Sequence, residues 1–363
     1  MTQQMPAQTV PLNDLGRLGA DERCAINAGV AGVVDSGWFL AGANVSSFEA
    51  EFGAYLGVDQ VIGVANGTDA LELAMRAILS GPGAEIVMAA NAGGYAATAA
   101  NVVGAQIVFA EVDERGLLDP DSAADALSDR TGAVVVTHLY GQCADVAQLR
   151  KVIPTEIPII EDCAQAHGAR RGDAIAGTMG TVATFSFYPT KNLGAFGDAG
   201  AVVTSSAELA DRIRQLRSYG WSTKYQADVV GGRNSRMDEM QAAILRVRLP
   251  YLDDRNARRR DILAAYRNVS GARFLGADDS GGVAHLAVML HDDRDQARVV
   301  LHERGIATDV HYPIPDHRQA AWRADHVSLP ETEALCDSIL TIPLFPQMTD
   351  LEVETVCAAL VQL

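Results

Sequence analysis

Two spacings of apolar residues alternate along the first 200 positions of the chain. Short apolar runs are typical of buried strands, and apolar residues three or four positions apart are typical of amphipathic helices. This pattern predicts helices at about 21–34, 46–55, 68–79, 95–103, 122–127 and 145–152, and strands at 61–65, 85–90, 106–112, 133–141 and 157–162. Because such alternation favours parallel strands with helices on both faces, we expect an α/β fold with a mostly parallel sheet.

The pattern changes after Val203. A helix at about 207–217 is followed by a Gly/Ser/Lys-rich loop at 220–234 and an amphipathic helix from Met237 to about Leu249. Pro250 interrupts this helix, which the basic stretch RNARRR continues. Further on we expect a strand at 283–290, a helix at 295–305 and a terminal helix after Thr349. We therefore predict an N-terminal arm (1–20), a large domain (21–250) and a smaller C-terminal α+β domain (251–363).

The segment VATFSFYPTKNLGAFGDAG, at 182–200, contains a single lysine, Lys191. The aromatic run before it (185–188) alternates with small polar residues, which is typical of a half-buried strand. Pro189 ends the run, and the glycines that follow allow unusual backbone angles. A lysine in these surroundings is partly desolvated, which favours the nucleophilic amine that Schiff-base chemistry needs. The alternative is an ordinary loop lysine that extends into solvent.

Charge and cysteine content exclude several classes of partner. The 363 residues carry a net charge of −17, which argues against nucleic acids and anionic membranes as partners. No apolar segment is long enough for a membrane span, and the N-terminus lacks the pattern of a signal peptide. The five cysteines are widely spaced, without a C-x-x-C pair, which indicates reduced cytoplasmic thiols rather than disulfides or a zinc site.

Three other features complement Lys191. Asp162 ends a predicted strand, so its carboxylate would face the crevice where such sheets bind ligands. Asn66-Gly67-Thr68 directly precedes a helix, whose backbone N–H groups and dipole favour a phosphate. Ser186 and Asn234 supply further hydrogen-bonding groups. Taken singly, Asp162 and Thr68 are more simply interpreted as helix caps.

Together these residues match the requirements of pyridoxal 5′-phosphate (PLP). That cofactor needs a lysine, an acid facing its pyridine nitrogen and an anion site for its phosphate. The Tyr95 ring is a candidate to stack on the cofactor ring. The free amine of Lys191 would then act as the base that moves the substrate proton.

Six longer motifs resemble the DegT/DnrJ/EryC-type sugar aminotransferases, the PLP-dependent family of aminosugar biosynthesis. The resemblance runs from about Trp38 to the C-terminus. The motifs are GVANGTDALELAMRA (63–77), THLYGQ (137–142), EDCAQAHGARR (161–171), FSFYPTKNLGAFGDAGAVVT (185–204), GRNSRMDEMQAAIL (232–245) and HYPIP (311–315). The resemblance implies a type I PLP-dependent aminotransferase fold and a homodimer with active sites at its interface.

The resemblance also implies a role for individual residues. Lys191 would be the Schiff-base lysine, Asp162 the partner of the pyridine nitrogen, and Gln165 a neighbour of the cofactor's 3-hydroxyl. The phosphate would be held by Gly67, Thr68 and Ser186, and by Asn234 from the neighbouring subunit. Tyr95 takes the stacking position, but Gly94 stands where the commoner family pattern has threonine, which puts the local ring contacts in doubt.

By the same resemblance, the substrate is a nucleotide-linked keto-sugar and the amino donor is glutamate. The motifs are most similar to the branch that aminates dTDP-3-keto-6-deoxyhexoses at C3; the C4-aminating branch and aminocyclitol aminotransferases remain alternatives. Candidate sugar contacts are Phe39, Tyr188, Lys224 and His311. Candidate diphosphate cations are Lys224, Arg233 and the pair Arg170 and Arg171, although each is more simply interpreted as a solvated charge. An ordinary buried role is at least as plausible for His317.

Other classes of protein fit less well. A regulatory protein that keeps the cofactor fold is the alternative from a different class, but no helix-turn-helix or basic arm is visible. A nicotinamide dehydrogenase is disfavoured because no G-x-G-x-x-G follows a predicted strand. Relatives that act as dehydratases have histidine in place of the lysine, and Lys191 is present here.

Overall fold

The predicted alternation of strands and helices folds around a seven-stranded sheet. The computed structural model describes residues 10–79, 81, 83–276, 281–322, 324 and 326–363. In sheet order the strands are β1 (Gln60–Val64), β9 (Gly200–Thr204), β8 (Val182–Ser186), β5 (Ile159–Asp162), β4 (Thr131–Thr137), β2 (Glu85–Ala89) and β3 (Gln106–Ala110). β9 is antiparallel to both of its neighbours, and the other adjacent strands are parallel. The expectation of a mostly parallel sheet is confirmed.

One face of this sheet is covered by α3 (Gly67–Ile78), α4 (Tyr95–Val102) and α7 (Ala207–Leu216). Their apolar sides meet alternate strand residues, such as Ile62 of β1, Ile86 of β2 and Val135 of β4. α3 begins after Asn66, whose side chain accepts the backbone N–H of Asp69 at 2.8 Å. This N-cap fixes the start of α3 at the carboxyl end of β1.

The opposite face is covered by α2 (Ala43–Leu56) and α8 (Glu239–Arg248) on one side and by α5 (Pro120–Asp125) and α6 (Val146–Val152) on the other. Phe52 of α2 packs edge-on against Phe185 and Phe187, with ring centroids 5.1 and 5.4 Å apart. α1 (Ala20–Ser36) lies against α8 on the outside. Helices therefore cover both faces, and the ends of the strands are left for ligands.

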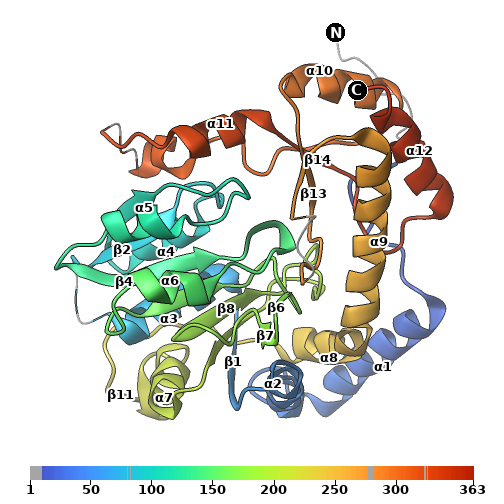
Figure 1. Cartoon of the computed structure of the whole chain (residues 1–363). Coiled ribbons are helices and arrows are strands. Elements are labelled where there is room, and N and C mark those ends of the chain that lie inside the picture. The colour runs from blue at the N-terminus through green and yellow to red at the C-terminus, as the bar shows by residue number, and fades with distance from the viewer. Residues whose placement is uncertain (1–9, 80, 82, 277–280, 323, 325) are drawn as a thin grey trace.

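A second, smaller sheet follows in the C-terminal part of the chain (Figure 1). It consists of β12 (Phe274–Leu275), β13 (Ala287–Leu290) and β14 (Ile339–Ile342), all antiparallel. α9 (Leu252–Ser270) leads to it from α8 through the short 3-10 helix η2 (Leu249–Tyr251), and α10 (Arg294–Glu303) and α12 (Asp350–Leu360) share its apolar core. α11 (Pro330–Ser338) precedes β14, and η3 (Asp316–Arg318) and η4 (Ala320–Trp322) lie between α10 and α11. The division into domains at residue 250 stays a prediction.

Three predicted segments differ in the structure. The strand expected at 133–141 ends at Thr137, and residues 139–141 form the 3-10 helix η1 (Leu139–Gly141). The strand expected at 283–290 begins only at Ala287, because Val283 and His285 donate their N–H groups to Gly141 and Tyr140 instead. The loop expected at 220–234 contains a small hairpin of β10 (Trp221–Thr223) and β11 (Gln226–Ala227). A further short pair, β6 (Arg170–Arg171) and β7 (Ala174–Ile175), follows β5.

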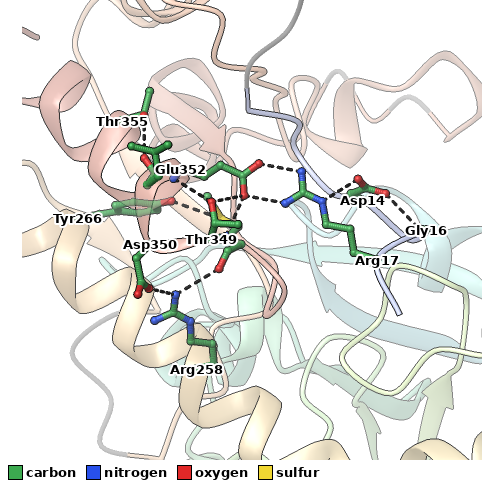
Figure 2. Close-up of polar contacts among 11 residues, drawn as sticks. Asp14, Gly16, Arg17, Arg258, Tyr266, Thr349, Asp350, Glu352 and Thr355 are labelled. Atoms are coloured by element: carbon green, nitrogen blue, oxygen red, sulfur yellow. Dashed lines mark hydrogen bonds and ion pairs between the residues drawn. The ribbon is translucent and has the colours of Figure 1, made fainter. Parts of the chain in front are cut away.

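Residues 1–9 of the predicted N-terminal arm lie outside the described residues. Val10 pairs with Ile306, and the Arg17 guanidinium binds both carboxylate oxygens of Glu352 at 2.7 and 2.8 Å (Figure 2). Glu352 also completes a capping box with Thr349 at the start of α12. These contacts hold the arm against the C-terminal part of the chain. Among the helices of the described residues, none combines the length and the apolar character that a bilayer span needs.

Candidate active site

A cavity of about 680 Å³ lies at the carboxyl ends of β5 and β8, beside the start of α3. We call it the large cavity. Nine of the residues singled out from the sequence line it: Gly67, Thr68, Tyr95, Asp162, Gln165, Ser186, Tyr188, Lys191 and His311. They come from segments more than 200 positions apart in the sequence. The fold therefore brings together the lysine, the acid and the anion site that sequence patterns suggested separately.

Gly67 and Ser186 form a narrow cradle at the start of α3. A Cβ atom on Gly67 would stand 2.5 Å from the Cβ of Ser186, which is closer than real Cβ atoms approach. The first backbone N–H groups of α3 have no partners within the helix and lie at its positive end. Thr68 lines the same part of the cavity. This arrangement suits a phosphate group, and only glycine fits at position 67 so close to Ser186.

Lys191 lies in the loop between β8 and β9. Its backbone N–H donates to the carbonyl of Tyr188 at 2.8 Å, which closes a turn after Pro189. The side chain is partly exposed because the cavity opens to solvent, but protein atoms surround it on most sides. Burial lowers the pKa of its amine from 10.5 to about 8, against the opposing effect of Asp162. About a tenth of the amine is therefore neutral, and nucleophilic, at pH 7, far more than for a lysine with the ordinary pKa.

Asp162 is the last residue of β5, and its side chain is buried in the wall of the large cavity. Burial raises the pKa of its carboxyl, although the Ala164 N–H, at 3.1 Å from Oδ1, and the nearby Lys191 oppose this shift. Oδ1 is thus oriented by the backbone. The preceding residue, Glu161, points to the other face of the sheet and anchors this end of the strand.

The anchor at Glu161 is a buried hydrogen-bond network with His138. His138 Nε2 lies 2.8 Å from Glu161 Oε2, and its Nδ1 accepts the N–H of Ala144 at 2.9 Å. Glu161 also accepts the backbone N–H groups of Gly177, Met179 and Gly180. Burial opposes ionisation of Glu161, but these hydrogen bonds outweigh it and lower the carboxyl pKa. His138, Glu161 and the nearby Cys163 are residue types that can bind a metal ion, and their ligand atoms lie close together. The carboxylate of Glu161, however, already accepts hydrogen bonds from protein groups.

Gln165 and Tyr312 both line the large cavity and are hydrogen-bonded to each other. Gln165 Oε1 accepts the N–H of Tyr140 at 2.8 Å, and its Nε2 donates to the Tyr312 hydroxyl at 3.2 Å. Tyr140 donates its hydroxyl to the carbonyl of His311 at 2.6 Å. These bonds connect the large sheet to the segment 309–312, so residues of the C-terminal part hold fixed positions in the cavity.

Tyr95 stands at the start of α4, half exposed in the cavity wall. Its ring meets Tyr312 edge-on, with centroids 6.2 Å apart. The unusual residue before it, Gly94, has φ of +73°, and a Cβ there would come within 2.6 Å of Trp322. A threonine at position 94 would therefore collide with Trp322. The glycine at position 94, where the commoner family pattern has threonine, thus fits the close packing of Trp322 in this chain.

His311 and His285 are the histidines that line the cavity. His311 Nδ1 lies 2.9 Å from the Thr341 hydroxyl, and burial lowers its pKa against the opposing effect of Asp309. His285 was not identified from the sequence. Its Nδ1 lies 2.8 Å from Asn192 Oδ1, next to Lys191 in the chain. A sequence signal for His285 exists, because it is the single polar residue within the apolar run VAHLAVML.

Three of the predicted site residues do not line the large cavity of their own chain: Phe39, Lys224 and Asn234. Phe39 is half exposed, and its carbonyl accepts the N–H of Glu239. Lys224 lies over the ring of Tyr225, with Nζ 5.0 Å from the ring centroid. Asn234 is exposed and accepts a hydrogen bond from Arg236 at 3.0 Å.

The arginines proposed for a diphosphate also lie outside this cavity. Arg233 is engaged with α3, through ion pairs to Asp69 at 3.2 Å and to Glu72. Arg171 pairs with Asp145 at 2.9 Å, whereas Arg170 is exposed on β6. His317 is fully buried, 2.9 Å from Glu333, as expected for an ordinary core histidine. Arg233 is therefore not a free cation for a diphosphate.

Comparison with known proteins identifies the group to which this geometry belongs. Residues 21–361 match the model of the DegT/DnrJ/EryC1/StrS aminotransferase family. The chain is 41% identical over 358 residues to the dTDP-3-amino-3,4,6-trideoxy-alpha-D-glucose transaminase of Streptomyces venezuelae, covering 96% of this chain and 94% of that protein. It is 40% identical to the dTDP-3-amino-3,6-dideoxy-alpha-D-galactopyranose transaminase of Aneurinibacillus thermoaerophilus, covering 96% and 98%.

Solved structures agree with this assignment. The crystal structure of S. venezuelae DesV in complex with a ketimine intermediate superposes with a TM-score of 0.93, at 40% identity, covering 97% of this chain and 98% of that one. The Bacillus subtilis protein NtdA, solved with the bound cofactor PMP, superposes with a TM-score of 0.92, at 27% identity, covering 99% and 86%.

Proposed function

Because the chain belongs to the DegT/DnrJ/EryC1/StrS aminotransferase family, we propose that it transfers the amino group of glutamate to C3 of a dTDP-linked 3-keto-6-deoxyhexose with the help of PLP. One observation carries the proposal: Lys191, Asp162 and the Gly67–Ser186 cradle line one cavity. The two relatives named above support the choice of C3, because both form 3-amino sugars linked to dTDP.

The residues present fit the cofactor. The cradle, which leaves no room for a Cβ at position 67, offers backbone N–H groups to a phosphate, the buried Asp162 offers a carboxyl group, and Lys191 offers an amine of lowered pKa. When bound, PLP supplies an electron sink for the carbon that carries the amino group. The other chemical requirements fall on the side chains.

We assign the proton transfer to Lys191. Its amine, with a pKa of about 8, accepts a proton at Nζ from the donor's α-carbon and returns one to the sugar carbon. Asp162 would place its carboxyl group against the bound ring at the wall of the same cavity, and Gln165 and Tyr95 would orient that ring. Two half-reactions at one site give ping-pong kinetics.

For the sugar, Tyr188 and His311 are the proposed contacts within the same chain, because both line the large cavity. Phe39, Lys224 and Asn234 require a second subunit. Trp38, Phe39, Tyr219 and Tyr225 are all more than 40% exposed, which is typical of a surface that another chain covers. We therefore propose a homodimer in which these residues complete the cavity of the partner.

The test converts the purified protein to its aminated form with glutamate and then adds dTDP-3-keto- or dTDP-4-keto-6-deoxyhexoses. We expect amination at C3, identified by NMR of the product. A product aminated only at C4 would overturn the choice of branch, and activity with a keto-cyclitol alone would favour an aminocyclitol aminotransferase. No spectral change with glutamate would contradict transamination, as would full activity of Lys191→Ala.

A further inference from the structure

A second cavity, of about 380 Å³, lies on the other side of the Lys191 loop. Its walls are the arm residues 13–18, the loop residues 189–192 and 195–196, residues 346–347, and side chains from α1, α8 and α9. Five arginines line it: Arg17, Arg23, Arg248, Arg255 and Arg259. We call it the arginine cavity. Such a cluster is unexpected in a chain with a net charge of −17.

The positive charge of this cavity is only partly balanced. Arg17 is neutralised by Asp14 and Glu352, as Figure 2 shows. Arg248 and Arg255 share one buried carboxylate, Glu22, at 3.2 and 2.6 Å. With Arg259, this part of the interior thus contains three arginines and one carboxylate, that of Glu22.

The positive charge of Arg259 is not balanced by a carboxylate among the described residues. It is 4% exposed, and one of its terminal nitrogens donates to the carbonyls of His285 and Leu344 at 3.2 and 2.9 Å. Its Nε is buried without a hydrogen-bond partner, and among the described residues no carboxylate pairs with it. Burial and repulsion from Arg255 and Arg248 lower its pKa to about 9. An unpaired buried charge is costly unless a counter-ion neutralises it.

We propose that the arginine cavity binds a small oxyanion, a carboxylate or a phosphate, between Arg255, Arg259 and Arg23. The guanidinium group presents planar pairs of donors that match both kinds of anion. Neither Gly67 nor Ser186 lines this cavity, so the site is separate from the cradle. The proposal does not depend on which sugar the enzyme aminates.

An anion in this cavity would act on the reaction through Lys191. Thr190 and Lys191 line both cavities, so the anion and the reactive amine share one loop as their wall. A negative charge nearby favours the protonated amine and raises its pKa. A bound anion therefore shifts the pH dependence of turnover to higher pH. Because arm residues 14–17 line the same cavity, the anion would also hold the arm against the Lys191 loop.

The test measures thermal unfolding of the protein saturated with PLP, which fills the cradle, while inorganic phosphate or glutarate is titrated. We expect a saturable rise in Tm with at least one of the two anions. Arg255→Gln and Arg23→Gln should weaken binding about tenfold, the worth of one charge-assisted hydrogen bond. Both variants leave Arg259 and its carbonyl contacts intact. Arg23→Gln also leaves both ion pairs of Glu22 in place, so it tests the site without the loss of a buried ion pair that Arg255→Gln entails.

Arg246→Gln is the matched control. Arg246 lies two residues from Arg248 on α8, but it pairs with Glu51 outside the cavity, so its loss should leave the titration unchanged. A response to phosphate alone identifies phosphate as the occupant, and a response to glutarate alone identifies a dicarboxylate. Equal binding by wild type and Arg255→Gln would overturn the proposal. So would a crystal structure in which a carboxylate of a second subunit pairs with Arg259.

Discussion

Asn192 Oδ1 lies 2.8 Å from His285 Nδ1, and this contact fixes a histidine in the wall of the large cavity. The Asn192 amide nitrogen donates to Asn256 Oδ1 at 2.8 Å and to the Val283 carbonyl at 3.0 Å. Its oxygen must therefore accept, and Nδ1 of His285 must carry the proton. Burial, with Lys191 and Arg259 nearby, lowers the pKa of His285 well below the ordinary value. The ring stays neutral, with Nε2 as an acceptor.

Asn192→Ala should destabilise the protein by about 2–3 kcal/mol, because it leaves the buried Asn256 oxygen and Val283 carbonyl without a donor. Urea unfolding at pH 7.5 measures the loss. Asn44→Ala is the control, because Asn44 makes a hydrogen bond to Arg246 at 2.9 Å in a less buried place, and should cost under about 1 kcal/mol. Equal losses in the two variants would contradict the role assigned to Asn192.

Gly67→Ala should lower the affinity for PLP at least about tenfold, because the new methyl group collides with Ser186 and forces the two walls of the cradle apart. The measurement is a titration of the purified protein with the cofactor, followed by its visible absorbance. Gly32→Ala in α1 is the control, since a Cβ at position 32 meets nothing within 4 Å. Wild-type affinity in Gly67→Ala would show that the phosphate binds elsewhere.

Lys191→Met should abolish transamination and yet stabilise the cofactor-free protein. Below pH 8 both folded and unfolded chains hold the lysine proton, so the folded state bears the full cost of burying the charge. Between pH 8 and 10.5 the unfolded chain binds more protons, and wild-type stability rises. The variant should therefore be more stable by up to about 3 kcal/mol at pH 7, with the difference gone by about pH 10.5.

Urea unfolding of both proteins without cofactor, at pH 7, 9 and 10.5, checks this expectation. A stability difference that does not change with pH would mean that the Lys191 amine keeps its ordinary pKa in the folded protein.

Much of this site could be predicted from the sequence because its main residues carry local signals. Lys191 follows an aromatic strand and precedes three glycines, Asp162 ends an apolar run, and Gly67 stands at a helix start. Each signal is contained within a few residues. The helix and strand positions were predictable for the same reason, since apolar spacing reports on immediate neighbours.

The contacts that join distant segments could not be predicted in this way. Tyr312 meets Gln165 across 147 positions, and His285 meets Asn192 across 93. The early end of β4 has the same origin, because residues 139–141 pair with the chain at 283–285 rather than extending the sheet. The arginine cavity is likewise formed from four separate segments, and no one of them is unusual alone.

Acid should loosen the arm before it unfolds the rest of the chain. The hydrogen bond from Arg17 lowers the pKa of Glu352 from 4.5 to about 2, so its contribution to stability is present above pH 4.5 and lost as the pH falls towards 2. The pair is near the surface, so this contribution is at most about 1 kcal/mol.

Arg17→Gln should therefore lower the unfolding free energy at pH 6 more than at pH 3. Arg214→Gln, which removes an exposed pair with Asp211, should change it little at either pH. An effect of Arg17→Gln that is equal at pH 6 and pH 3 would show that Glu352 titrates normally.

Because β9 runs antiparallel to β8, the loop that carries Lys191 begins and ends at neighbouring positions of the sheet. Ser186 of β8 pairs directly with Gly200 of β9, so residues 187–199 leave the sheet and return to it within one strand spacing. Hydrogen bonds from Phe187 to Ala199 and from Ala195 to Phe187 close the base of this loop. Lys191 is thus carried on a loop whose two ends are held together by the sheet. Phe187 packs against Phe52 and Asn192 donates to Asn256, so the position of Lys191 within this loop is also fixed from α2 and α9.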